Sequence, residues 1–383
     1  SKLYSNGNEI LYNKNGDVIK IQNSLVCNGK KLYSKNSIIS CKVSGVQRSL
    51  YNENGKNISI TNSILGRLEN ESDSGIVNII SGNIASITNL GTLNIGTKNN
   101  DESVEIVVGS VGNYNEGTFN LYEGTIKKSF DREDGLTTLV SNTGIFNMYG
   151  GIINSHRSDD TSLHIYALDS YGQFNMYGGE IVVTNGNEND ISVSVSGVTN
   201  LYDGTITNTN GIGMKVNNSV VTGKKCTINA KIGAKTSGTS SIKNCIINAD
   251  TKGIIVDEDD TSNADTTGIV ASILTLTDNE ITATDSYGID NSGTLIIESG
   301  SVTSINSTGV YNRNGKISIG IKGDKDSEDN NLTSIINPMI KGKDYGVKAK
   351  YASSSGISFY DGIIKGENDI DLLFNEIELN YDV

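Results

Sequence analysis

The chain has 383 residues with 43 glycines, a single proline and a formal net charge of −13. This acidic balance builds no basic stripe, so we expect no nucleic-acid partner. No apolar run is long enough to cross a bilayer, so we expect no membrane insertion by this segment. Since the first residue is Ser1, we also expect the segment to belong to a longer protein.

The first 45 residues contain an early form of a recurrent corner sequence. Tyr12-Asn-Lys-Asn-Gly16 returns as Tyr51-Asn-Glu-Asn-Gly55 and as Tyr311-Asn-Arg-Asn-Gly315. Asn and Gly are residues that turns favour. We therefore expect residues 1–45 to form the N-terminal turns or cap of a repeat structure.

A phrase of eight residues is repeated four times in the middle of the chain. Its copies are Phe119-Asn-Leu-Tyr-Glu-Gly-Thr-Ile126, Phe146-Asn-Met-Tyr-Gly-Gly-Ile-Ile153, Phe174-Asn-Met-Tyr-Gly-Gly-Glu-Ile181 and Thr199-Asn-Leu-Tyr-Asp-Gly-Thr-Ile206. The shared glycine stands at 124, 151, 179 and 204, so the steps are 27, 28 and 25 residues. A repeat this short cannot bury its own apolar face and must stack on its neighbours, which predicts a solenoid.

Each copy predicts a short strand, a glycine turn and a second strand. Phe146 and Met148 alternate with Asn147 and Tyr149, and this period of two is typical of a strand with one face inward. An Asn-x-Gly sequence precedes the first strand, at Asn89, Asn115, Asn142 and Asn291. We expect it to supply the left-handed backbone of another corner.

The glycine slot continues along the chain with other residues in it. It is filled by Cys226, Cys245, Asn279, Gly300 and Gly362. The sequence therefore predicts a single-stranded parallel β-helix with about three strands per turn and roughly a dozen turns. We expect right-handed coiling, the default for parallel crossovers. The β-helix is expected to span residues 46–366 as one domain, and residues 367–383 to form a C-terminal capping segment.

Two of the four cysteines share one slot on consecutive turns. Equivalent atoms of Cys226 and Cys245 would lie about 5 Å apart, a separation that a disulfide accepts. A stacked pair of reduced thiols is the alternative, because a disulfide needs an oxidising compartment. Cys27 and Cys41 have no assigned partner, and no spacing predicts a zinc site.

The sequence predicts no catalytic residue. Ser155, His156 and Asp159 could be assembled into a triad, but adjacent residues of a strand point to opposite faces. The other histidine, His164, lies in an alternating segment, and Asp159-Asp160 is the one paired-aspartate candidate near the repeat. The five arginines do not share a repeat slot.

Two acidic segments resemble calcium loops in part. They are residues 257–265 and 324–330, and Asp324, Asp326 and Glu328 alternate as the first ligands of such a loop do. The sharp-turn glycine and the distal glutamate are absent at their spacing. Exposed, solvated loops explain these charges more simply. We therefore expect no cofactor, with calcium as the alternative.

One outward slot of the repeat holds a row of tyrosines beside a row of asparagines. The candidate ligand-binding residues are Tyr122, Tyr149, Tyr177 and Tyr202, together with Asn120, Asn147, Asn175 and Asn200. Tyr360 fits the same slot near the far end. Exposed aromatic residues beside amides suit a glycan or protein partner. A tyrosine ladder that only stabilises the sheet is the alternative.

Other phrases of the chain resemble the repeats of large bacterial surface proteins. Gly288-Ile-Asp-Asn-Ser-Gly-Thr-Leu-Ile-Ile-Glu-Ser-Gly300, Val310-Tyr-Asn-Arg-Asn-Gly-Lys-Ile-Ser-Ile319 and Phe359-Tyr-Asp-Gly-Ile-Ile-Lys365 are similar to those of adhesin-like β-helix proteins of the pectin-lyase-like superfamily. The Gly-His-Gly and Arg-Ile-Lys motifs of its pectin-degrading members have no counterpart here.

This resemblance implies a non-enzymatic, extracellular module on a bacterial cell surface. It implies an adhesin or stalk whose partner is a host or cell-surface glycan or protein. A polysaccharide lyase or glycoside hydrolase is the alternative, because one fold carries many activities.

Overall fold

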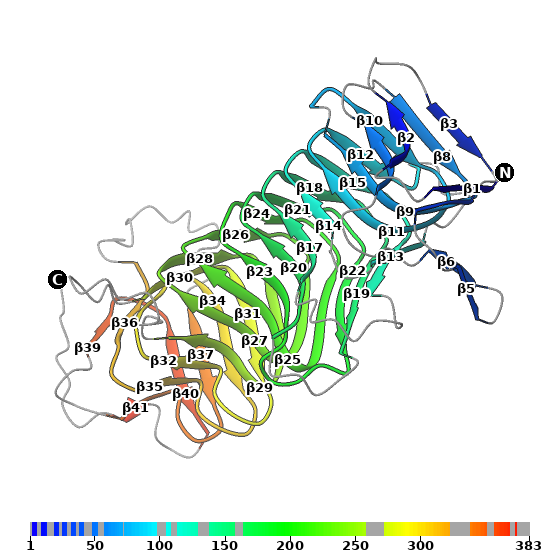
Figure 1. Cartoon of the computed structure of the whole chain (residues 1–383). Coiled ribbons are helices and arrows are strands. Elements are labelled where there is room, and N and C mark those ends of the chain that lie inside the picture. The colour runs from blue at the N-terminus through cyan, green and yellow to red at the C-terminus, as the bar shows by residue number, and fades with distance from the viewer. Residues whose placement is uncertain are drawn as a thin grey trace, which may run out of the picture. The chain divides into compact units, whose positions relative to one another are not determined.

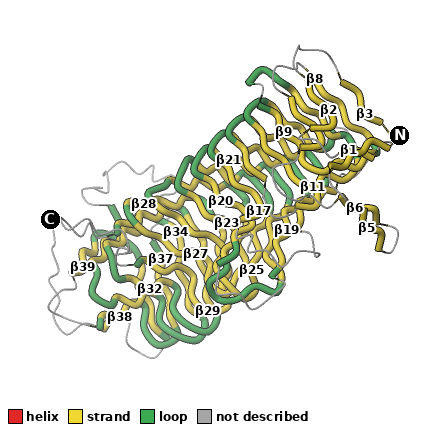
Figure 2. The backbone as a smooth tube through the Cα atoms, in the orientation of Figure 1, coloured by secondary structure: helices red, strands yellow, loops and turns green. Residues whose placement is uncertain are grey.

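A computed structural model gives the fold of the chain (Figures 1 and 2). It describes residues 2–5, 9–13, 19–22, 25–28, 32–35, 38–41, 48–52, 57–71, 73–97, 105–108, 113–128, 138–157, 164–257, 272–321, 338–350, 356–367 and 372–373. These residues form strands and connecting turns without any helix, so none of them belongs to a helix that could span a membrane. The chain divides into two compact units, Ser1–Val193 and Ser194–Val383.

Each unit is a parallel β-helix, in which a turn of chain passes over three faces, as the sequence predicts. The first face ends at the glycine turn, the second follows that turn, and the third leads back to the next first-face strand. The first face of unit 1 consists of β3 (Ile19–Gln22), β8 (Asn57–Thr61), β10 (Ile76–Ile79), β12 (Thr92–Ile95), β15 (Thr118–Leu121), β18 (Ile145–Met148) and β21 (Gln173–Met176). These strands pair in register, so that Asn120 lies beside Asn147 and Asn147 beside Asn175.

The other two faces of unit 1 are stacked in the same way. The second face holds β1 (Lys2–Ser5), β4 (Leu25–Asn28), β13 (Glu105–Val108), β16 (Thr125–Lys128), β19 (Ile152–His156) and β22 (Glu180–Thr184). The third face holds β2 (Glu9–Asn13), β7 (Arg48–Asn52), β14 (Asn113–Asn115), β17 (Thr138–Asn142) and β20 (Tyr166–Ser170). Two longer strands, β9 (Ser63–Asn70) and β11 (Gly82–Asn89), run through both faces. A further strand, β23 (Ile191–Val195), contains the division between the units.

Unit 2 repeats this plan with several long strands. Its first face holds β24 (Thr199–Leu201), β26 (Val220–Gly223), β28 (Thr239–Lys243), β30 (Ile273–Thr277), β33 (Thr294–Ile297), β36 (Lys316–Ile319) and β39 (Gly356–Phe359). Three strands cross from the second face to the third, namely β25 (Thr205–Asn217), β27 (Thr227–Ser237) and β29 (Ile246–Val256). The second face continues as β31 (Asn279–Ala283), β34 (Gly300–Ser304), β37 (Met339–Gly342) and β40 (Ile363–Gly366). The third face continues as β32 (Ile289–Asn291), β35 (Val310–Asn312), β38 (Val347–Ala349) and β41 (Leu372–Leu373).

The apolar residues of the repeat line the interior of each turn. In unit 1 the ring of Phe146 stacks on those of Phe119 and Phe174, with centroids 4.7 and 5.4 Å apart. Met148 and Met176 are fully buried beside them. The inward and outward alternation read from the sequence is therefore confirmed, and stacking of like residues from successive turns forms the core.

The glycine turn after the first face is present as predicted, and its glycines adopt a left-handed backbone. Gly124, Gly151 and Gly179 have φ between 78° and 106°. A Cβ on Gly151 would also lie 2.7 Å from the carbonyl oxygen of Gly124 in the turn below. In unit 2, Cys245 and Asn279 fill this slot, and the left-handed residue is then the one before, Asn244 or Asp278. Asn and Asp tolerate this conformation best among residues with a side chain.

The prediction for the Asn-x-Gly corner is wrong in its physical reason. Asn89, Asn115 and Asn142 do not have a positive φ; their side chains are buried and bonded to one another. The glycine is needed for a different reason, because a Cβ on Gly117 would lie 2.1 Å from carbonyl oxygens of the turn below. These corners therefore select Asn for an interior amide and Gly for close backbone approach.

The described strands of residues 1–45 include a pairing unlike those of the repeat. Besides parallel strands, they contain an antiparallel pair, β5 (Leu32–Lys35) and β6 (Ile38–Cys41), in which Lys35 lies beside Ile38. The prediction that residues 1–45 and 367–383 cap the β-helix stays a prediction, because 368–371 and 374–383 lie outside the described residues.

Candidate functional site

The tyrosines of the repeat form a continuous stack beside the first face of unit 1. Ring centroids are 4.9 Å apart both from Tyr122 to Tyr149 and from Tyr149 to Tyr177, with interplanar angles of 10° and 7°. Tyr149 and Tyr177 still expose 42% and 41% of their surface. Because near-parallel rings at this spacing cover much of each other's faces, the stack presents mainly ring edges and phenol groups outward.

An asparagine row lies next to this stack, two residues earlier in each strand. The side-chain amides of Asn94, Asn120, Asn147 and Asn175 each donate to the amide oxygen of the asparagine one turn before, over 2.8 to 2.9 Å. The row begins at Asn78. We call these tyrosines and asparagines the Tyr–Asn strip. Register alone fixes the strip, since each strand pairs with its neighbour without a shift.

The remaining members of the predicted row belong to unit 2. Tyr202 follows β24 and is 42% exposed, and Asn200 lies within that strand. Tyr360 follows β39 and is half-buried. Tyr202, Asn200 and Tyr360 therefore lie at the positions along the turn that the repeat predicts.

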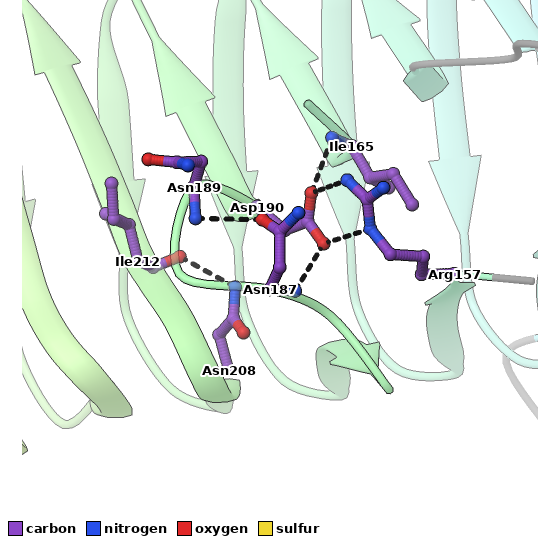
Figure 3. A network of polar contacts seen from close by, with 7 residues as sticks. All are labelled: Arg157, Ile165, Asn187, Asn189, Asp190, Asn208 and Ile212. Atoms are coloured by element: carbon purple, nitrogen blue, oxygen red, sulfur yellow. Dashed lines mark hydrogen bonds and ion pairs between the residues drawn. The ribbon is translucent and has the colours of Figure 1, made fainter. Parts of the chain in front are cut away.

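Arg157 and Asp190 form a buried ion pair in unit 1 (Figure 3). Asp190 is fully buried and accepts bonds from Nε and Nη2 of Arg157 at 2.9 and 2.6 Å. It also accepts the backbone N–H groups of Ile165 and Asn187 at 3.0 and 2.7 Å. Burial raises the pKa of Asp190, but these donors outweigh it and hold the pKa below its usual value. Because both of its oxygens accept hydrogen bonds, the Asp190 carboxylate holds the backbone at Ile165 and Asn187 in place.

A second buried carboxylate lies on the third face of unit 2. Asp290 binds Nε and Nη2 of Arg313 at 2.6 and 2.7 Å and Nζ of Lys252 at 2.6 Å. The rings of Tyr287 and Tyr311 stack beside it with centroids 4.4 Å apart. Burial raises the pKa of Asp290, whereas the bonds from Arg313 and Lys252 lower it below its usual value. The sequence predicts neither ion pair. Arg157 and Asp190 are 33 residues apart, Asp290 and Arg313 are 23 apart, and no motif links them.

The two described residues of the hypothetical triad, Ser155 and His156, do not come together. Ser155 is buried inside β19, whereas the half-buried His156 lies within hydrogen-bond distance, 3.1 Å, of the Thr184 hydroxyl. They face opposite sides of the strand, as the alternation predicts. Asp159 and Asp160 lie outside the described residues, and His164 is exposed.

The predicted calcium ligands Asp324, Asp326 and Glu328 also lie outside the described residues. Of the acidic segment 257–265, the structure describes Asp257, which forms an ion pair of 2.6 Å with Lys235. In the described part of the chain, no three His, Cys, Asp or Glu side chains are grouped to hold a metal ion.

Cys226 and Cys245 are present as free, buried thiols. They lie on adjacent turns, since the N–H of Ile246 bonds to the carbonyl of Cys226. Burial raises the pKa of both thiols, that of Cys245 to about 12. Their side chains therefore pack as small apolar groups.

Comparisons with known proteins do not place the chain in a family. No protein-family model, no curated protein and no solved structure matches it. The Tyr–Asn strip is therefore interpreted from its own geometry.

Proposed function

We propose that the chain is a non-enzymatic, extracellular binding module of a bacterial surface protein, an adhesin or stalk. The Tyr–Asn strip is its contact surface for a host or cell-surface glycan or protein. The stacked turns hold the strip rigid, so that little ordering entropy is lost when a partner binds.

One observation supports this assignment most directly. Three tyrosines in contact keep an exposed edge, with Tyr149 and Tyr177 each about two-fifths accessible. Tyrosine is enriched at interfaces because it combines a large apolar ring with a hydroxyl that forms hydrogen bonds. The adjacent amides add a polar row that suits hydroxyl or peptide groups.

Substitution of two tyrosines separates recognition from stabilisation. A Tyr149→Ser/Tyr177→Ser variant loses both ring contacts, which we expect to lower unfolding free energy by about 1–3 kcal/mol. Tyr149→Phe/Tyr177→Phe keeps the stack and removes the hydroxyls. Binding of both variants to a glycan array and to immobilised matrix proteins is compared with that of the unmodified chain.

We expect the Ser variant to lose binding and the Phe variant to weaken it. Tyr171→Ser is the control, since Tyr171 is 58% exposed and lies outside the strip. Unchanged binding by the Ser variant, with a lower melting temperature, would reduce the strip to a stabilising ladder and overturn the proposal.

A further inference from the structure

A shallow groove lies on the surface of unit 2, well apart in sequence from the Tyr–Asn strip. It has a volume of about 190 Å³ and is lined by residues of β25, β27, β29 and β31 and by Thr284 in the turn after β31. These four strands pair in succession. Its length across three strand intervals is about 14 Å.

The backbone of a column of alanines forms the floor of this groove. Ala230 lies in register with Ala249, and Ala249 with Ala283. Ala230 and Ala249 are only 5% and 4% exposed and alternate along their strands with the outward-facing Asn229 and Asn248. Their methyl groups therefore face the interior, and their backbone lies at the bottom of the groove.

Irregular strand pairing lies next to the groove. The register shifts between Asn208 and Ile212 in β25 and between Ala230 and Ile232 in β27. A β-bulge bends its strand and redirects side chains, and bulges are frequent next to binding sites. The groove lies where the long strands pass this bend, beside Thr209 and Asp250.

The walls carry hydrogen-bonding groups with a single charge. The side-chain amide of Asn248 donates to the amide oxygen of Asn229 over 3.0 Å. This bond uses neither the side-chain NH₂ of Asn229 nor the side-chain oxygen of Asn248. Asp250 adds two acceptors, and the hydroxyl of Thr282 both donates and accepts. The lining holds no aromatic ring and no cation.

From this lining we infer that the groove is a binding site for a neutral, hydroxyl-rich saccharide. Amides and a carboxylate pair with neighbouring hydroxyls of a sugar ring. One carboxylate with no second acid does not build a divalent-cation site. An anionic ligand would meet Asp250 without a compensating cation. This site is independent of the Tyr–Asn strip.

The test is a titration followed by NMR on the full chain. Glucose, galactose, mannose and N-acetylglucosamine are added separately, and amide shifts of Asn229, Asn248 and Asp250 are recorded. We expect at least one sugar to move these resonances, with a dissociation constant on the order of 1–10 mM for so open a site. Calcium chloride is titrated as a competing ligand class.

Two variants show whether the groove itself binds the sugar. We expect Asn248→Ala and Asp250→Asn each to weaken binding about tenfold, since each removes a hydrogen bond to the ligand. Because Asn248 and Asp250 are exposed, we expect both variants to keep the fold of the unmodified chain. Asn314→Ala, an exposed amide outside the lining, is the control and is expected to leave binding unchanged.

Three results would overturn the assignment. They are the absence of any shift with all four sugars, binding that persists in both groove variants, and calcium shifts at Asp250 that exceed those of every sugar.

Discussion

The side-chain amide of Asn89 donates a hydrogen bond of 2.8 Å to the amide oxygen of Asn115, one turn further along the interior of unit 1. The same bond joins successive turns from Asn52 to Ser170, and each side chain is at most 2% exposed. The members are Asn52, Asn70, Asn89, Asn115, Asn142 and Ser170. Such chains of buried hydrogen bonds polarise one another and leave each member costly to remove.

Replacing Asn115 by leucine is expected to destabilise unit 1 strongly. The change keeps the volume but removes the Asn115 oxygen that accepts one N–H of the Asn89 amide, and the Asn115 N–H that bonds to the Asn142 oxygen, in the dry interior. Another bond of the Asn89 amide, to the Gly91 carbonyl, remains. We expect unfolding free energy to fall by about 2–4 kcal/mol, measured by urea denaturation. Asn120→Leu, in the outer row, is the matched control and should cost about 1 kcal/mol, because water can reach its neighbours. Equal losses would contradict an interior role for the amide.

Gly151→Ala is expected to disrupt the first corner. Its φ of 78° is unfavourable for alanine, and the added Cβ would lie 2.7 Å from the Gly124 oxygen. Together these effects should lower unfolding free energy by about 2–4 kcal/mol. Gly356→Ala is the control, since a Cβ there meets nothing within 4 Å. A melting temperature for Gly151→Ala equal to that of the control would show that the corner can relax.

The Arg157–Asp190 pair predicts a specific acid sensitivity. Because the folded pKa of Asp190 lies below its unfolded value of about 3.9, the pair contributes fully above that pH. Its contribution is lost as pH falls through the folded pKa. Breaking the pair with Asp190→Asn should cost about 3 kcal/mol at pH 7, because Arg157 is left buried without its counter-ion.

The difference between the unmodified chain and Asp190→Asn isolates this carboxylate from all others. We expect the difference in unfolding free energy to be constant from pH 7 to about 5 and to shrink below about 4. Circular dichroism at a series of pH values measures it. A difference that stays constant to pH 2 would show that Asp190 does not titrate in this range.

The two buried thiols are expected to resist alkylation in the native protein. With its pKa raised to about 12, Cys245 holds almost no thiolate at pH 8, and Cys226 is shifted in the same direction. Iodoacetamide followed by peptide mass spectrometry should label Cys226 and Cys245 only after unfolding. Failure to label them in unfolded, unreduced protein would reveal a disulfide between these turns.

The repeated phrase was sufficient to predict how the turns stack. Phe146 inward, Tyr149 outward and Gly151 at the corner follow from a period of two and from glycine chemistry, and all three are as expected. The sequence also predicts that Cys245 and Asn279 replace the glycine of this corner in their turns. Local sequence carries this information because each turn contacts only its neighbours.

Interactions across loops could not be predicted in the same way. Arg157 and Asp190 form an ion pair across a connection whose path no sequence periodicity predicts. Asp290 binds Lys252 and Arg313, which belong to two different turns. The interior role of Asn89, Asn115 and Asn142 was missed, although a signal exists: each stands at the same offset from the inward-facing residues of its turn. The antiparallel pair of Leu32–Lys35 and Ile38–Cys41 had a hairpin signal as well, two β-prone runs separated by Asn36 and Ser37.

Gly124, Gly151 and Gly179 repeat one interface at intervals of 27 and 28 residues, so the surface above each such turn matches the surface below it. Unequal crossing-over between two copies of the gene segment would therefore insert or delete a complete coil without creating a new junction. The tyrosine row would lengthen or shorten with each event, by one ring at a time. The number of stacked tyrosines could therefore change through recombination alone, without compensating substitutions first.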